Sequence, residues 1–179
     1  MQFNFELFPS ENIVVLPFKS IKGKTIEELK KVFYEKGIQG FFVNAKLVIS
    51  LKHILIGYNK ALLKLQGPNK SKEEIEKAFI SAMIPSESKL AKLGASLKLS
   101  SLDSNGILII SNLSGEKYDT AKIKEFLGRI EEEKIQDIGS TADIDLLKQV
   151  YEINDKEVQL DTDIRGSIYS AIALKNLRQ

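Results

Sequence analysis

The sequence predicts a mixed α/β (α+β) fold, in which a single domain over residues 1–179 packs helices against a small mixed or antiparallel sheet. Short apolar runs alternate along the chain with longer segments whose apolar residues recur at helical spacing. Two of these longer segments begin with a Ser or Thr that is followed three residues later by Glu. No internal repeat, low-complexity tract or long linker divides the chain, and 179 residues with 43% hydrophobic content suffice for one core.

The N-terminal part predicts a strand, a helix and two extended segments, in the ranges 12–18, 24–37, 40–44 and 46–50. The first range is β-branched and apolar, and Pro17 is expected to interrupt it because proline donates no hydrogen bond to a sheet. Thr25 and Glu28 form a capping box for the helix, and Gly37 ends it.

The remaining elements are three helices, two strands and three further helices, in the ranges 50–67, 71–84, 86–94, 95–100, 106–111, 119–130, 143–151 and 164–177. Ser50 caps the first of these helices, and Ser71 with Glu74 forms a capping box for the second. Pro85 ends the second helix or begins the third, and Gly94 closes the third. The two strands are expected to pair with each other around the segment 101–105.

The helix that follows Ser50 has a polar face of unusual charge. At 100° per residue its leucines, isoleucines and Tyr58 form one stripe, whereas Lys52, His53, Lys60 and Lys64 lie within roughly 120° on the opposite side. From Lys36 to Lys72 there are seven lysines and no acid, although the whole chain has 24 acids. Exposed helix faces usually mix both signs, so this face predicts contact with a polyanion.

The charge of the whole chain follows the same division. Residues 1–35 are neutral, residues 36–102 carry a net charge of +7 and residues 103–179 carry −5, which together give the net charge of +2. This separation predicts a polyanion site in the middle of the chain and a different partner for the C-terminal part.

The motifs of catalysis are absent or incomplete. Gly23, Lys24 and Thr25 imitate the end of a phosphate-binding loop, but Phe18 stands where its first glycine belongs. Residues 161–166 begin like a calcium loop but place Arg165 at a ligand position. His53 is the only histidine and there is no cysteine, so histidine clusters and thiolate sites are excluded. We therefore expect no enzymatic activity, no metal site and no cofactor.

The N-terminus, MQFNFELFPSEN, lacks the basic and apolar regions of a signal peptide, and no apolar segment approaches the length of a membrane span. These patterns predict a cytoplasmic protein without a membrane partner.

The order of these segments resembles that of a known family. The chain contains LVISLKHILIGYNKALLKLQG, then AMIPSESKLAKLGASLKLS and GILIIS, and finally IDLLKQVYEI and IRGSIYSAIALKNL. This order is similar to that of the small regulatory subunit of the KEOPS complex, the Cgi-type or TPRKB-like family. The resemblance runs from about Ile13 to the C-terminus, so it implies a single domain of this type over residues 1–179.

The resemblance implies a non-catalytic subunit that supports the threonylcarbamoyladenosine modification of tRNA. Such a subunit docks on the atypical kinase/ATPase of the complex, binds tRNA at its single-stranded 3′ CCA end, and meets the carbamoyl-transferase subunit only indirectly. We expect the tRNA-binding residues to be Lys46, Lys52, His53, Lys60, Lys64, Lys89, Lys92 and Lys98. The range 164–177 is apolar on most sides and rich in small residues, which predicts either a central core helix or a helix with one face in the core and the other on a partner. The resemblance implies that this partner is the kinase, and the interface residues are then expected to be Ile164, Ile168, Ala171, Ile172 and Lys175.

Two alternatives remain. The chain is a protein-interaction module without nucleic-acid binding if the lysines serve solubility alone. It is an enzyme acting on a phosphorylated small molecule if Lys24 and the helix after it bind a phosphate.

Overall fold

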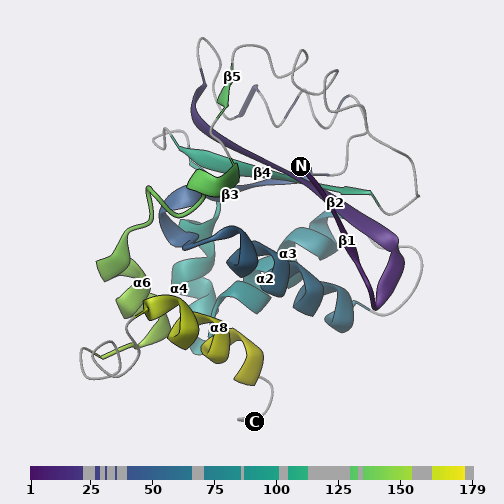
Figure 1. The fold of residues 1–179 in the computed structure, drawn as a ribbon. Coiled ribbons are helices and arrows are strands. Elements are labelled where there is room, and N and C mark those ends of the chain that lie inside the picture. The colour runs from purple at the N-terminus through teal and green to yellow at the C-terminus, as the bar shows by residue number, and fades with distance from the viewer. Residues whose placement is uncertain are drawn as a thin grey trace. The chain divides into compact units, whose positions relative to one another are not determined.

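The structure is a computed structural model (Figure 1), and it describes residues 1–21, 27–28, 31, 35, 40–65, 71–85, 87–100, 105–112, 130–132, 135–154 and 163–175. These residues divide into two compact units, each of two chain segments. Unit 1 comprises Met1–Ala45 and Lys98–Ile138, and unit 2 comprises Lys46–Leu97 and Gly139–Gln179. Among the described residues no helix has both the length and the apolar character that crossing a membrane requires.

Unit 1 contains an antiparallel sheet of β1 (Gln2–Phe5), β2 (Phe8–Ile21), β3 (Gly40–Asn44), β4 (Gly106–Asn112) and β5 (Ile130–Glu132). The strand order is β1-β2-β4-β3, and β5 pairs with the far end of β2. A single turn of 3-10 helix, η2 (Ile135–Asp137), follows. Ile109 of β4 lies opposite Val15 of β2 on one side and opposite Phe41 of β3 on the other. All three side chains are buried, so neighbouring strands contribute adjacent side chains to the core of the sheet.

Pro17 lies inside β2, so the prediction that it interrupts the strand is wrong. The amide of Val15 donates to the carbonyl of Met1 at 3.0 Å, and the nitrogen of Pro17, two residues later, faces the same side of β2. On that side, β2 is bonded to the N-terminal strand up to Val15 and to β5 from Phe18 onward. Pro17 lies in the gap between these two pairings. A strand position that needs no donor tolerates proline.

Unit 2 contains the helices α2 (Leu51–Lys64), α3 (Lys72–Met83), α4 (Glu87–Leu97), α6 (Ile144–Tyr151) and α8 (Ile164–Leu174). α2 packs on α3 through its predicted apolar stripe, whose residues Ile54, Tyr58, Ala61 and Leu62 are buried. The caps at Ser50 and at Ser71 with Glu74 are confirmed, because each serine accepts a hydrogen bond from the amide three residues later.

Two predicted boundaries are wrong. Residues 46–50 are not extended, since η1 (Ala45–Leu47) is followed by a link in which Val48 and Ile49 are both buried. Residues 95–100 do not form a hairpin with β4, because α4 continues through Gly94 to Leu97. Leu93 and Leu97 are spaced four apart, and this helical spacing prevails over the alternation of residues 95–100.

The mixed α/β prediction is confirmed, with an antiparallel sheet. The prediction of one domain over residues 1–179 stays a prediction. Most of the predicted helix 24–37 lies outside the described residues, although Glu27, Glu28, Lys31 and Glu35 are helical. The predicted helix 119–130 also lies outside them, except that its last residue begins β5.

Candidate docking and polyanion-binding surfaces

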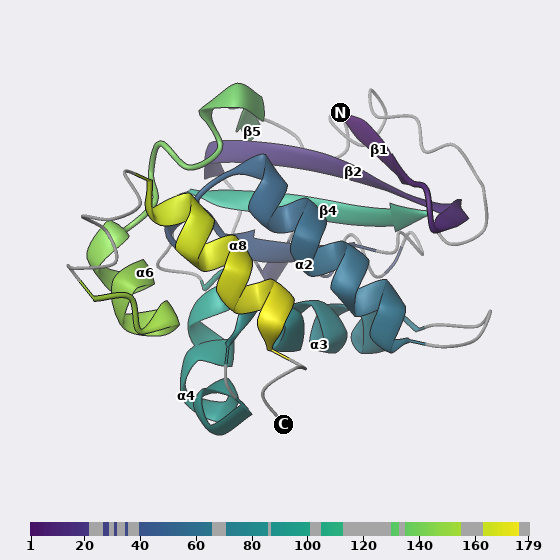
Figure 2. The same cartoon turned by 60° about the horizontal axis from the view of Figure 1, so that its bottom comes forward.

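The polar face of α2, formed by Lys52, His53, Lys60 and Lys64, is covered in part by α8. Figure 2 shows α8 lying beside α2. At one end, the hydroxyl groups of Ser50 and Tyr169 are 2.5 Å apart. The ammonium group of Lys52 lies over the ring of Tyr169, 5.1 Å from its centre. This face is therefore not wholly open to solvent.

Lys60 connects α2 to the last turn of α8. Its Nζ donates a hydrogen bond to the carbonyl of Ile172 and another, at 3.3 Å, to that of Ala173. The Ile172 carbonyl also accepts from the amide of Lys175 at 3.4 Å. Carbonyls at the end of a helix carry a partial negative charge, so a cation there is favourable. Burial lowers the pKa of Lys60 from its ordinary value. Contacts inside unit 2 thus explain in part why α2 carries lysines and no acids.

Two further ammonium groups meet at Ser81 of α3. Lys64 Nζ donates to the Ser81 hydroxyl at 3.4 Å, and Lys175 Nζ donates to the Ser81 carbonyl. Ser81 is buried, whereas the Lys64 residue is exposed. The C-terminal end of α8 is thus tied to both α2 and α3 by lysines that bind neutral oxygens.

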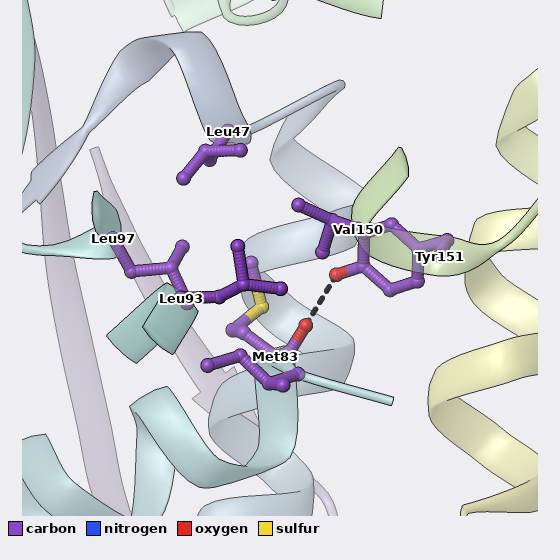
Figure 3. Close-up of a pocket in the computed structure, with 7 residues that line it drawn as sticks. Leu47, Met83, Leu93, Leu97, Val150 and Tyr151 are labelled. Carbon is purple, nitrogen blue, oxygen red and sulfur yellow. Dashed lines mark hydrogen bonds between the residues drawn. The ribbon is translucent and has the colours of Figure 1, made fainter. Parts of the chain in front are cut away.

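His53 is fully buried, so the prediction that it lies on a water-facing side is wrong. Its Nδ1 accepts a hydrogen bond from the amide of Ile49 at 3.3 Å, which places the proton on Nε2. Nε2 then donates to the Tyr151 hydroxyl at 2.8 Å, and this hydroxyl donates to the carbonyl of Met83 (Figure 3). Burial lowers the pKa of His53 to about 3 and raises that of Tyr151. His53 has no access to a phosphate.

Apolar side chains surround the Tyr151 end of this network and line a small pocket: Leu47, Met83, Ile84, Leu93, Leu97, Val150 and Tyr151 (Figure 3). The space between them is too small for a water molecule. This pocket is therefore part of the core of unit 2 and offers no ligand site.

The other lysines predicted to bind tRNA differ in their surroundings. Lys46 and Lys52 are exposed, and Lys89 Nζ forms an ion pair at 2.6 Å with Glu152, at the end of α6. Lys98 is exposed but belongs to unit 1, where its backbone forms an isolated antiparallel β-bridge with Val43 of β3. The side chain of Lys92 lies outside what the structure describes. Unit 2 thus brings Lys52, Lys60 and Lys64 together on α2, with Lys46 just before it.

Two of the residues predicted for the kinase interface are not accessible. Ile168 and Ile172 have no exposed surface, so these residues of α8 pack inside unit 2. Helical spacing places both on one side, which contacts α2. The predictions that Ile168 and Ile172 lie on a docking surface are therefore wrong. Ile164, Ala171 and Lys175 are half-buried at the margins of that side.

The opposite side of α8, which we call the outer face, carries mostly small and uncharged side chains. It consists of Gly166, Ser167, Ser170, Ala173 and Leu174. Ser170 and Ala173 are exposed, and Leu174 leaves 39% of its surface exposed. Side chains of this size allow the backbone of another protein to approach closely.

Sequence reasoning missed Tyr169, Tyr151 and Ser81. Tyr169 bonds to Ser50, the cap of α2, from 119 positions away, Tyr151 bonds to His53 from 98 positions away, and Ser81 bonds to Lys64 from the neighbouring helix. No local pattern carries that information. Among the described residues no group of three or more His, Cys, Asp or Glu side chains is placed to hold a metal ion.

Two comparisons relate the chain to known proteins. The family model described as "Kinase binding protein CGI-121" matches residues 18–176. The chain is also similar to the EKC/KEOPS complex subunit TPRKB of zebrafish (Danio rerio), with 24% identity over 178 residues, which cover 97% of this chain and 97% of that protein. The family match includes the sheet from the end of β2 onward and every helix of unit 2 named above.

Proposed function

The chain belongs to the CGI-121 family of kinase-binding proteins, and from this premise we propose that it is a non-catalytic regulatory subunit of the KEOPS complex. In this role it docks on the atypical kinase/ATPase subunit, binds tRNA near the 3′ CCA end, and supports threonylcarbamoyladenosine modification. It meets the carbamoyl-transferase subunit only through the kinase. The likeness to a KEOPS subunit over 97% of both chains supports the assignment to this complex.

We assign kinase docking to the outer face of α8. The observation that carries this assignment is an uncharged, partly exposed helix face on a member of a kinase-binding family. Gly166, Ser170 and Ala173 let a partner helix or strand approach closely, and Leu174 supplies an apolar anchor. Ile164 and Ala171 extend this surface at its edge, while Ile168 and Ile172 hold α8 in place from inside unit 2.

The docking assignment is tested by Ser170→Arg, which adds a long charged side chain to the outer face. We expect the affinity for the kinase subunit to fall at least about tenfold, because a desolvated charge at the centre of an interface is costly. Gln149→Arg on the exposed side of α6 is the matched control and should bind as the unaltered chain does. Equal kinase affinity of both folded variants, measured by calorimetry, would place the interface elsewhere.

We assign tRNA binding to the exposed lysines around α2. Lys46, Lys52 and Lys64 are the exposed members of the predicted set in unit 2, and Lys60, Lys89, Lys92 and, in unit 1, Lys98 are further candidates. Lysine supplies a point charge that suits phosphates and reads no base. The acid-free run from Lys36 to Lys72 supports this assignment.

A titration of tRNA with and without its CCA end tests the RNA assignment. Lys46→Ala combined with Lys52→Ala should weaken binding, whereas Lys31→Ala should not, because Lys31 is an exposed lysine next to Glu35 at 3.9 Å. The loss of CCA should weaken binding of the unaltered chain. If tRNA binds no more tightly than it binds other proteins of similar charge, the chain is a protein-interaction module without nucleic-acid binding. The internal contacts of Lys60 and Lys64 favour that second function.

A further inference from the structure

Tyr169 is an aromatic residue whose ring reaches the surface of unit 2. Of the Phe and Tyr side chains that the structure describes in this unit, Tyr58, Phe79 and Tyr151 are buried, whereas Tyr169 is half-buried. Its hydroxyl group lies 2.5 Å from that of Ser50, the cap of α2, and this bond holds the ring beside the first turn of α2. A ring that is fixed in place and partly exposed binds a flat partner at a small cost in side-chain entropy.

The ammonium group of Lys52 lies over this ring, 5.1 Å from its centre. Lys52 is exposed, so the ring face that its ammonium group covers is reached from the solvent. A cation over an aromatic ring in water is held only weakly, and a nucleobase stacked on the same ring binds more strongly. A base can therefore take the place of the ammonium group, which is then available to a phosphate of the same strand.

Arg165 adds a second cation to the same flank of α8. It lies four residues before Tyr169, so helical spacing places both on one side of the helix. Its guanidinium group pairs with Asp163 at 3.7 Å, and both side chains are more than half exposed. An ion pair that is exposed to water contributes little, so Arg165 can turn to a phosphate while Asp163 still caps α8 through the Arg165 amide. The ring thus has a lysine over its face and an arginine one turn away.

An accessible aromatic ring beside cations is typical of proteins that hold single-stranded nucleic acids, because the ring stacks on a base while the cations contact the backbone. We propose that Tyr169, together with Lys52, forms the stacking site for one nucleobase of the single-stranded 3′ CCA end of tRNA. The inference rests on the proposed function for the identity of the RNA, and it adds a contact to a base where the lysines alone contact phosphates. It uses no residue of the outer face of α8, so it is compatible with a docked kinase.

Substitution of the ring separates stacking from the structural bond to Ser50. Tyr169→Phe keeps the ring and loses only the hydroxyl group, so its tRNA affinity should stay within about twofold of that of the unaltered chain. Tyr169→Leu keeps an apolar side chain without a ring face, and its affinity should fall about fivefold or more. Equal affinity of the two folded variants for complete tRNA would overturn the inference, while the RNA-binding function would stand.

The same variants, measured on tRNA that lacks CCA, test which part of the RNA supplies the base. The unaltered chain, Tyr169→Phe and Tyr169→Leu should bind this shortened tRNA alike. If Tyr169→Leu loses as much affinity for the shortened tRNA as for the complete one, the stacked base lies outside the CCA end and the inference is wrong.

Salt dependence distinguishes stacking from a ring that merely holds Lys52 in place. Lys52→Ala should make the slope of log affinity against log salt shallower by about 0.7, because one phosphate contact on a single strand is lost. Tyr169→Leu should lower affinity by the same factor at every salt concentration, because stacking involves no counterion. A shallower slope in Tyr169→Leu would show that the ring acts only through Lys52, which would overturn the stacking site.

A fluorescent ring at the same position gives a direct readout. The chain contains no tryptophan, so Tyr169→Trp reports from this site alone. Complete tRNA should quench the emission of this folded variant through the stacked base, and tRNA without CCA should quench it less. Unchanged emission at saturating tRNA would overturn the inference even if Tyr169→Leu does not fold. If the unaltered chain binds no tRNA at all, both the RNA-binding function and this inference fail.

Discussion

His53 is a buried histidine whose neutral form is required by its neighbours. Ile49 donates to one ring nitrogen, and the Tyr151 hydroxyl, itself a donor to Met83, accepts from the other. A second ring proton would meet the amide hydrogen of Ile49 and would carry a charge into a site without exposure. The ring therefore joins α2, α6 and the end of α3 as long as it is uncharged.

We expect the free energy of unfolding to fall in mild acid because of His53. Its folded pKa of about 3 lies below the ordinary 6.5, so the stabilisation is complete above pH 6.5 and is lost as the pH falls toward 3. Between pH 7.5 and pH 5 this group alone should cost about 2 kcal/mol, measured by urea unfolding. His53→Gln should be less stable at pH 7.5 but should lose less over the same range. An equally steep pH dependence in that variant would assign the effect to other groups.

At the scale of the elements, the contact between α2 and α3 depends on the absence of a side chain at Gly57. A Cβ built there would lie 2.5 Å from the sulfur of Met83 and 3.3 Å from the ring of Phe79. Both neighbours are fully buried, so neither can move away freely.

Gly57→Ala should therefore lower the free energy of unfolding by about 1–3 kcal/mol, although alanine is the better helix former. Gly94→Ala is the matched control, because its Cβ would meet Ile80 at an ordinary 3.5 Å and α4 should gain from alanine. Thermal unfolding of both variants measures the difference. Two variants of equal stability would show that α2 and α3 can shift apart without cost.

At the scale of the whole molecule, the surfaces proposed for the two partners differ in charge. The RNA assignment uses exposed lysines such as Lys46, Lys52 and Lys64, whereas the outer face of α8 has no charge. Salt screens the first kind of contact and hardly affects the second.

Added salt should therefore separate the two interactions. Three phosphate contacts on a single strand give a slope of about −2 for log affinity against log salt. Kinase affinity should change much less over the same range. A steep salt dependence of kinase binding would argue for an interface outside the outer face of α8.

The sequence by itself determined the mixed class of the fold, the apolar stripe of α2 and the helix caps at Ser50 and Ser71. These features depend on residues within a few positions of each other, because helical spacing and capping are local. The order of the same segments was also enough to indicate the family that the match over residues 18–176 shows.

Only the tertiary structure decided what the polar face of α2 contacts. Its partners Tyr151, Tyr169 and Ile172 lie about a hundred residues away, and periodicity shows which side is polar but not what covers it. The same holds for Pro17, which fits β2 because of a gap between neighbouring strands, and for Ile168, whose side of α8 is chosen by packing. Local patterns determine which side chains seek burial, whereas contacts between distant segments determine which polar groups remain in water.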